Sequence, residues 1–147
     1  MRRKRKTGAV RSKKKVIDGI EFSSSLEAYT YSKLKEAGIE FGYESETYQV
    51  LPSFKYDGTY LSSSPKKKEL TDKTGKTVRA VTYTPDFVAK DGSWIIETKG
   101  FVPSQHSFPL RWKMFLTLMS QQGSPAVYLP KNQSQVDDVI EHIKQGL

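Results

Sequence analysis

The amino-acid sequence predicts an α/β domain in which helices flank a mixed central β-sheet on two faces. Three observations favour this class. The expected elements follow in the order helix, three strands, helix, strand, helix. Asp91 and Gly92 stand between two short apolar runs, which is typical of a β-hairpin. Apolar residues recur at helical spacing in several segments. Elements of both kinds bury their apolar faces by packing helices on a sheet.

The first third of the chain predicts a helix between strands. Residues 16–22 are typical of a short strand or turn, and residues 39–51 alternate like a strand. Between them, Ser23 to Ser25 offer N-cap residues to a helix of about residues 25–37, which Gly38 ends. We expect three residues on the buried side of this helix: Leu26, Leu34 and Ala37.

The middle of the chain predicts a polar insertion and then a strand pair. Residues 52–77 are rich in Ser, Lys, Asp, Gly and Pro. They indicate a basic loop or ribbon with short strand pieces at its ends. Such a segment either contacts a ligand or is a solvated insertion. Residues 77–88 then form a strand, and residues 93–99 form its partner.

The last third predicts two helices around a short buried strand, residues 125–130. Ser107 and Pro109 mark the start of a helix that runs to Gly123. Its apolar stripe is Leu110, Met114, Phe115, Leu118 and Met119. Residues 134–145 form the closing helix, with Ser134 as its cap. Its inward residues are Val136, Val139, Ile140 and Ile143.

The hairpin would bring two carboxylates together. If Asp91-Gly92 is the centre of a type I′ turn, Val88 faces Ile95 and Asp86 faces Glu97. Paired residues lie roughly 4.5–5.5 Å apart, where like charges repel each other. A divalent cation held between the carboxylates would compensate, and Mg²⁺ prefers such oxygen ligands.

Strand alternation adds a third charged residue to this pair. It places Lys99 on the face of Glu97 and turns Trp94 and Ile96 to the opposite face. A simpler interpretation stays open. Asp86 would then be a surface residue near a turn, and Glu97 and Lys99 would lie on a solvated strand face.

Glu27 is a candidate third acid. On a helical wheel it lies within ~20° of Leu34 and ~40° of Tyr31, so its side chain points inward. Two structural alternatives remain. Ser24 and Glu27 fit a capping box, in which Glu27 only satisfies backbone donors. Alternatively, Glu27 lies at the boundary of the core and reaches water.

Pro85-Asp86 followed by Glu97-Thr98-Lys99 resembles the signature of the PD-(D/E)xK nuclease superfamily. Two segments, Tyr83-Thr84-Pro85-Asp86-Phe87 and Glu97-Thr98-Lys99-Gly100, look like those of phage endonuclease I-type junction-resolving enzymes and of related phage and prophage nuclease-like proteins. Lys76-Thr77-Val78-Arg79-Ala80 before the motif adds to the second likeness. The resemblance covers roughly residues 16–130. It implies a restriction-endonuclease-like core.

The resemblance also implies roles for five residues. Glu27, Asp86, Glu97 and Lys99 would be catalytic. Asp86 and Glu97 would bind the metal directly, with the Thr98 carbonyl and Glu27 as further ligands. Lys99 would orient the attacking water and stabilise negative charge. Because the ligands are all oxygens, the metal would be Mg²⁺ or Mn²⁺.

Composition excludes several other kinds of site. The 147 residues include no cysteine and only two histidines, so zinc–thiolate and histidine-rich sites are excluded. No apolar stretch approaches a membrane span, and the N-terminus lacks the apolar core of a signal peptide. We therefore expect a cytoplasmic protein, in the host cytoplasm if a phage encodes it. No phosphate-binding loop motif is present, so no nucleotide cofactor is expected.

Positive charge is concentrated at the N-terminus. The net charge is +8, and residues 1–15 contain nine bases and no acid. We expect residues 1–15 to be a disordered arm before a nuclease domain of residues 16–147, into which the 52–77 segment is inserted. The predicted nucleic-acid contacts are Arg2, Arg3, Lys4, Arg5, Lys6, Arg11, Lys13, Lys14, Lys15, Lys66, Lys67, Lys68, Arg111 and Lys113. For the arm the alternative is a solubilising tail, and for Arg111 and Lys113 it is solvated helix charges.

Together these features predict a Mg²⁺-dependent DNA endonuclease that prefers branched DNA or Holliday junctions. Paired cuts would require a homodimer. The alternatives are a non-catalytic DNA-binding or packaging protein on a nuclease fold, a duplex-cutting nuclease of restriction or transposition type, and an RNA-processing nuclease.

Overall fold

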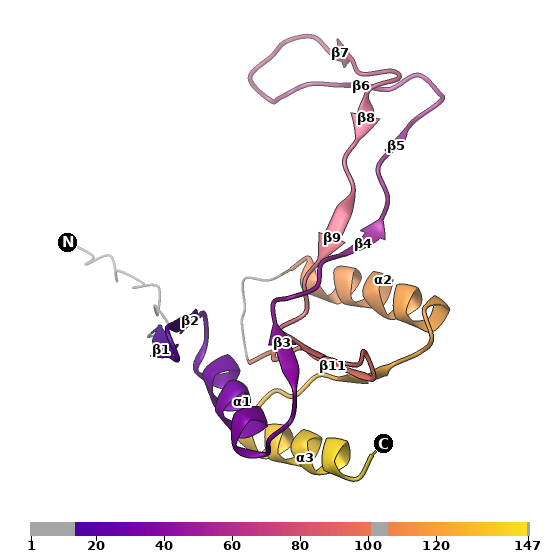
Figure 1. Cartoon of the computed structure of the whole chain (residues 1–147). Coiled ribbons are helices and arrows are strands. Elements are labelled where there is room, and N and C mark those ends of the chain that lie inside the picture. The colour runs from indigo at the N-terminus through magenta and orange to yellow at the C-terminus, as the bar shows by residue number, and fades with distance from the viewer. Residues whose placement is uncertain (1–13, 101–105, 147) are drawn as a thin grey trace, which may run out of the picture. The chain divides into compact units, whose positions relative to one another are not determined.

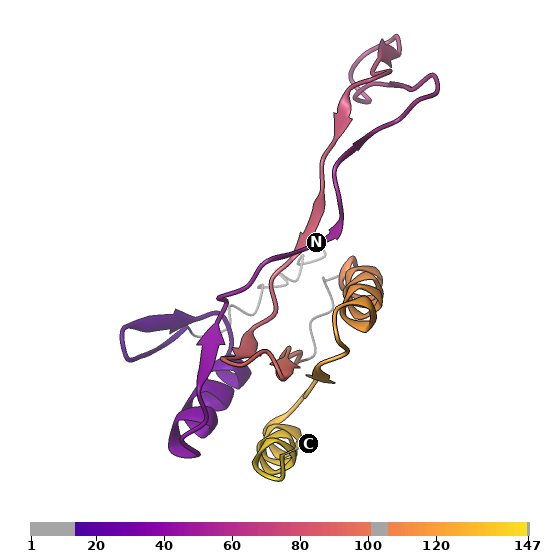
Figure 2. The same ribbon diagram turned by 45° about the vertical axis from the view of Figure 1, so that its right-hand side comes forward.

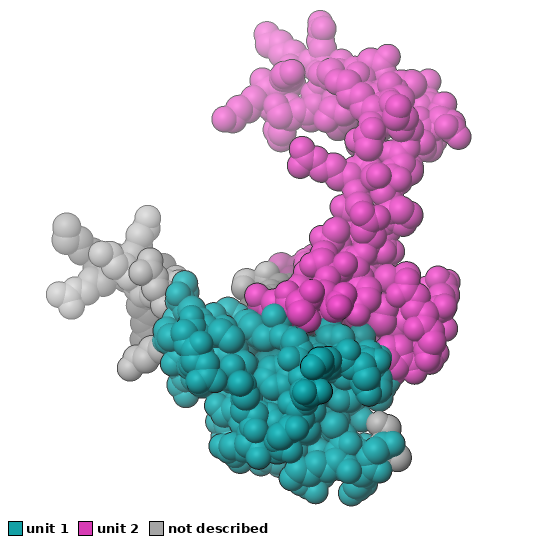
Figure 3. All heavy atoms as spheres, in the orientation of Figure 1, with its two compact units in different colours: residues 1–43, 86–102, 126–147 teal, residues 44–85, 103–125 magenta. Residues whose placement is uncertain are grey.

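The computed structural model describes residues 14–100 and 106–146. These residues divide into two compact units (Figure 3). Unit 1 comprises the described parts of residues 1–43, 86–102 and 126–147, and unit 2 those of residues 44–85 and 103–125. Each unit therefore combines segments that are distant in the sequence.

Unit 1 is an α/β arrangement built on a four-stranded mixed sheet. Its elements are β1 (Lys15–Ile17), β2 (Ile20–Phe22), α1 (Ser25–Glu36), β3 (Phe41–Tyr43), β10 (Phe87–Ala89), β11 (Trp94–Ile96), β12 (Ala126–Tyr128) and α3 (Gln133–Lys144) (Figure 1). The strand order is β12-β11-β10-β3, in which only the β11–β12 pair is parallel. The predicted α/β class with a mixed central sheet is thereby confirmed.

The β10–β11 hairpin has the register that the sequence predicted. Val88 pairs with Ile95, and Phe87 with Ile96. The predicted type I′ turn is wrong, because Gly92 has a positive φ of 76° but Asp91 does not. Instead the Gly92 N–H donates to the Ala89 carbonyl at 3.0 Å. The Asp91 carboxylate accepts from the N–H and hydroxyl of Ser93 at 3.0 and 2.6 Å, so a side chain closes the loop.

The core of unit 1 lies between one face of this sheet and two helices. Phe87, Ala89, Trp94 and Ile96 alternate onto that face and join a buried cluster with residues of α1 and α3. The buried residues of α1 are Glu27, Ala28, Thr30, Tyr31 and Leu34. Leu26 and Ala37 are only partly buried, so the inner side of α1 is rotated from the predicted one. A helix layer on the second face stays a prediction.

Unit 2 combines one helix, α2 (Phe108–Gln121), with three antiparallel strand pairs. The pairs are β4 (Tyr48–Leu51) with β9 (Val81–Tyr83), β5 (Phe54–Lys55) with β8 (Thr77–Val78), and β6 (Leu61–Ser62) with β7 (Thr71–Asp72). Figures 1 and 2 show the strand pairs following one another along a narrow, two-stranded hairpin. The predicted strand pieces at the ends of the 52–77 segment correspond to β5 and β8.

Aromatic side chains form the core of unit 2. Phe115 is fully buried, and its ring lies 4.7 Å from that of Tyr83 and 5.4 Å from that of Tyr48. Met119 is also buried. Leu110 is 65% exposed, so its place on the predicted apolar stripe is wrong. It lies in the first turn of α2, and at 100° per residue it is about 140° away from Phe115 around the helix.

Local features break three other predicted elements. The strand predicted for residues 39–51 is two strands, β3 and β4, because Glu44 has a positive φ of 46° and ends the ladder. The strand predicted for residues 77–88 is interrupted before β10, where Pro85 cannot donate to a ladder. The cap of α3 is Asn132, not Ser134, because Asn132 accepts from the Gln135 N–H.

Across the parts of the chain that the structure describes, no helix has both the length and the apolar character that a membrane crossing requires.

Candidate metal centre

Asp86 and Glu97 are adjacent at the open end of the β10–β11 hairpin. Asp86 directly precedes β10 and Glu97 directly follows β11, one step beyond the Phe87–Ile96 pair. The Asp86 N–H donates to Glu97 Oε2 at 3.2 Å. Asp86 is 8% exposed and Glu97 6% exposed. The structure therefore excludes the open interpretation in which both were solvated surface acids.

Thr98 holds the Asp86 carboxylate in place. Asp86 Oδ2 accepts from the Thr98 N–H at 2.8 Å and from the Thr98 hydroxyl at 2.6 Å. Thr98 itself is buried. These two bonds use the donors of Thr98 and leave its predicted role, metal binding through the carbonyl, as a prediction.

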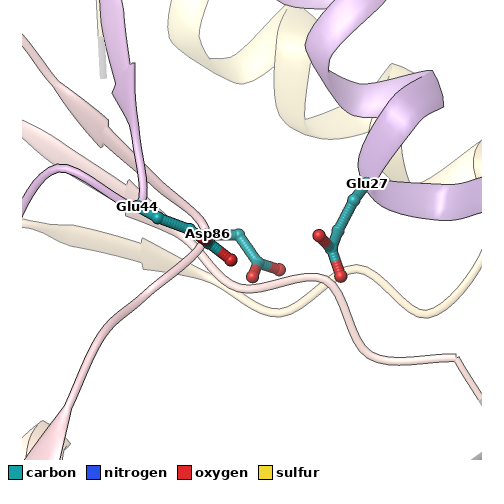
Figure 4. Close-up of side chains that lie close together, drawn as sticks. All are labelled: Glu27, Glu44 and Asp86. Carbon is teal, nitrogen blue, oxygen red and sulfur yellow. The ribbon is translucent and has the colours of Figure 1, made fainter. Parts of the chain in front are cut away.

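Glu27 reaches the same place from α1. Glu27 is 7% exposed, and Figure 4 shows its carboxylate and that of Asp86 turned toward each other. An oxygen of Glu27 and an oxygen of Asp86 lie within 4.8 Å. The helix N-terminus and the hairpin thus bring acids 59 positions apart in the sequence into one cluster.

The hydrogen bonds of Glu27 combine capping with a second function. Its backbone N–H donates to the Ser24 hydroxyl at 3.1 Å, which is the N-cap bond. Its carboxylate accepts from the hydroxyls of Ser23 at 2.7 Å, Ser24 at 3.2 Å and Tyr43 at 2.7 Å. Capping therefore uses the backbone of Glu27, while the carboxylate is oriented by hydroxyl groups beside Asp86.

The three acids create a strongly unfavourable site for negative charge. Burial, together with the charges of Glu97 and Glu27, raises the pKa of Asp86 to about 8, although the Thr98 hydrogen bonds act in the opposite direction. Without a cation, the cluster therefore favours holding a proton at Asp86. Such a cluster gains stability by binding either a proton or a metal ion.

Lys99 follows this cluster in a segment that β12 supports. The Glu97 N–H donates to the Tyr128 carbonyl and the Lys99 N–H to the Pro130 carbonyl, each at 3.0 Å. Lys99 is half-buried. The parallel strand β12 and the residues directly after it therefore fix the backbone from which the side chains of Glu97 and Lys99 extend.

The predicted nucleic-acid contacts occupy varied positions. Arg2, Arg3, Lys4, Arg5, Lys6, Arg11 and Lys13 lie outside the described residues. Lys14 pairs with Glu21 at 2.8 Å, and Lys15 begins β1. The side chains of Lys66, Lys67, Lys68 and Lys113 are exposed. The Arg111 guanidinium donates to the Thr82 carbonyl at 2.6 Å and lies over the Tyr83 ring, so it has a structural role within unit 2.

Sequence reasoning passed over Ser23 and Tyr43 as site residues. Ser23 precedes the N-cap and Tyr43 ends β3, and both donate to Glu27. No sequence pattern indicated the role of Tyr43, because only the pairing of β3 with β10 brings Tyr43 opposite Phe87, next to Asp86. Figure 4 also labels Glu44, an exposed residue that follows Tyr43 in the chain and belongs to unit 2.

The chain belongs to the family described as Protein of unknown function (DUF1064), whose model matches residues 7–129. That match includes every residue of the acidic cluster. Among curated proteins and solved structures, none matches the chain at a significant level.

Proposed function

We propose that the protein is a metal-dependent endonuclease that hydrolyses phosphodiester bonds in DNA. The observation that carries this proposal is the buried acidic cluster of Glu27, Asp86 and Glu97, which Thr98 orders and Lys99 follows. Buried acids placed this close together destabilise the fold, and a purely structural role would give no compensating function. The proposed restriction-endonuclease-like core rests on the mixed sheet together with the sequence resemblance.

The residues present fit a hard divalent cation. The cluster supplies only oxygen donors. Burial and then the charges of Glu97 and Glu27 raise the pKa of Asp86, and a bound cation would neutralise those charges. Asp86, Glu97 and the Thr98 carbonyl would hold Mg²⁺ or Mn²⁺, with Glu27 nearby. When bound, such an ion neutralises phosphoryl oxygens and makes water a better nucleophile.

The protein's own side chains would complete the reaction. Lys99 would orient water and stabilise the negative charge that develops on the phosphate. Thr98 would keep Asp86 in position through its two hydrogen bonds. Ser23 and Tyr43 would do the same for Glu27, which restricts where its carboxylate lies.

The resemblance favours branched DNA or Holliday junctions as substrates and a homodimer for paired cuts. The decisive assay incubates the full chain with a four-way junction, a flap and a linear duplex of the same sequence, and with the matching RNA. Each substrate is tested with Mg²⁺, with Mn²⁺ and with EDTA. Asp86→Asn and Glu97→Gln serve as matched variants, with thermal unfolding to verify their fold.

Mg²⁺-dependent cleavage that both variants lose is the expected result, with the junction cut fastest. Cleavage of RNA alone would assign an RNA-processing nuclease. Tight DNA binding without cleavage of any substrate would assign a non-catalytic DNA-binding protein. Cleavage by both variants at the normal rate would reject the acidic cluster as the active site.

A further inference from the structure

The part of unit 2 between Leu51 and Ala80 presents aromatic rings to solvent. We call residues 52–79 the ribbon. Three of its rings are markedly exposed: Phe54 by 45%, Tyr56 by 53% and Tyr60 by 43%. Exposed aromatic side chains that cluster in one segment indicate a surface that another molecule covers.

Two of these rings are held in defined positions. The rings of Tyr56 and Tyr60 lie 6.5 Å apart in an edge-on arrangement. A Cβ atom at Gly58 would lie 2.8 Å from Tyr56 Cε1, so the absence of a side chain there lets the Tyr56 ring rest against the backbone. The backbone at Tyr60 is fixed as well. Its N–H donates to the Thr74 hydroxyl at 3.0 Å, and its carbonyl accepts from the Lys73 N–H at 2.7 Å.

The ribbon also carries the net positive charge of the chain after residue 13. Its seven bases outnumber its three acids, whereas residues 14–51 and 80–147 together hold ten bases and thirteen acids. The bases are Lys55, Lys66, Lys67, Lys68, Lys73, Lys76 and Arg79. The covering molecule is therefore expected to be an anion.

We propose that the ribbon binds single-stranded nucleic acid, with bases stacked on Tyr56 and Tyr60 and phosphates near its lysines. Aromatic platforms beside cationic side chains are how proteins hold unpaired strands without reading sequence. A base in an intact duplex has no free face to offer such rings. This inference rests on the proposed function in taking DNA as the ligand, and it names unpaired DNA as the part of the substrate that the ribbon recognises.

The test measures binding of the full chain, in EDTA, to fluorescent oligo(dT) and to an abasic strand with the same number of phosphates. The variants are Tyr56→Ala/Tyr60→Ala and its matched control Tyr56→Phe/Tyr60→Phe, which keeps both rings. Gly58→Ala displaces the Tyr56 ring without removing it. A fourth variant, Lys66→Gln/Lys67→Gln/Lys68→Gln, removes charge alone. Circular dichroism and thermal unfolding verify each fold.

The wild type should prefer oligo(dT) to the abasic strand by at least about tenfold, because each stacked base contributes strongly to affinity. The double alanine variant should lose this preference, Gly58→Ala should reduce it, and the double phenylalanine variant should keep it. The lysine variant should keep the preference but make the slope of log K against log salt shallower by roughly 2 units.

Equal affinity of the wild type for both strands would overturn the proposal. So would a preference that the double alanine variant retains. If sedimentation shows that the double alanine substitution only dissociates a dimer, the ribbon is instead an interface between copies. None of these measurements requires cleavage, so a protein that never cuts DNA but stacks bases would disprove the nuclease and leave the ribbon assignment intact.

Discussion

At the scale of single residues, the acidic cluster favours a bound proton, with which the proposed cation would compete. Burial and the neighbouring acids raise the pKa of Asp86 to about 8 from its ordinary value of 3.8. At a pH between these two pKa values, the folded state holds a proton on Asp86 that the unfolded chain has released. Proton binding at Asp86 therefore stabilises the folded state when no cation is bound.

We predict that this proton sets the pH dependence of stability in EDTA. Between about pH 4 and about pH 8 only the folded state keeps the proton, so the contribution of Asp86 to the free energy of unfolding should fall as pH rises through this range. Above about pH 8 both states have lost the proton, and the contribution should be constant. Asp86→Asn should abolish this dependence. Thermal unfolding between about pH 4 and about pH 9 checks this, because that interval spans the whole window. A wild-type curve that matches the asparagine variant would contradict it.

Excess Mg²⁺ should reverse the trend. A cation that binds the folded state alone stabilises it by mass action, and it competes with the proton at Asp86. The melting temperature should therefore rise on addition of Mg²⁺ at pH 8 more than at pH 5. Asp86→Asn and Glu97→Gln should show little rise, although both should match or exceed the wild type in EDTA at the higher pH.

Thr98 offers a test that spares the acids. Thr98→Val removes the 2.6 Å hydroxyl bond to Asp86 but keeps the N–H bond and the shape of the side chain. The loss should cost about 1–3 kcal/mol of stability, since the carboxylate is buried. It should also raise the pKa of Asp86 further, because that bond favours the charged form. A carboxyl ¹³C titration of the metal-free protein measures this, with Thr117→Val as a surface control.

At the scale of elements, α1 separates the cap from the site. Ser24→Ala removes the N-cap acceptor and should cost about 1 kcal/mol of stability. Glu27→Gln keeps the backbone bond to Ser24 and should cost little stability, yet it should abolish cleavage. Parallel unfolding and cleavage assays compare the two variants. Full activity in Glu27→Gln would mean that the Glu27 carboxylate has no part in cleavage and that the residue has only a structural role in the first turn of α1.

The buried ring of α2 tests the core of unit 2. Phe115 contacts the rings of Tyr48, Tyr83 and Trp112, so Phe115→Ala should lower the free energy of unfolding by about 3–5 kcal/mol. Leu110→Ala on the same helix is the matched control, and because Leu110 is exposed it should change stability by less than about 0.5 kcal/mol. Denaturant unfolding measures both. Similar losses from the two variants would contradict this account of the helix.

At the scale of the whole molecule, the N-terminal bases are expected to add affinity without selectivity. Since β1 begins at Lys15 and Lys14 pairs with Glu21, the clean truncation removes residues 1–13 and its seven bases. If about four of them meet phosphates, the slope of log K against log salt should become shallower by roughly 3–4 units. A preference for branched DNA should survive. A salt titration on junction and duplex tests both points, and an unchanged slope would mean that this segment does not contact DNA.

Local physical rules determined several features from the sequence alone. Ser24 and Gly38 bracket α1 because capping and the left-handed turn act within a few residues. The register of Val88 with Ile95 followed from placing Asp91-Gly92 at the centre of the hairpin, although the predicted turn type was wrong, and it brought Asp86 beside Glu97. These predictions succeeded because each depends on neighbours in the chain.

Only the tertiary structure decided the remainder. The meeting of Glu27 with Asp86, the Tyr43 bond to Glu27 and the Thr98 bonds to Asp86 depend on how elements and backbone turns are placed in space. Periodicity gives the face of a helix to within a broad arc, so it placed Leu26 and Leu110 too deep. Nor does it say where a ladder stops, as it does at Glu44 and before Asp86. Contacts between distant segments decide the acidic cluster and the helix faces, whereas the ladder ends at Glu44 and Pro85 are backbone features that periodicity does not report.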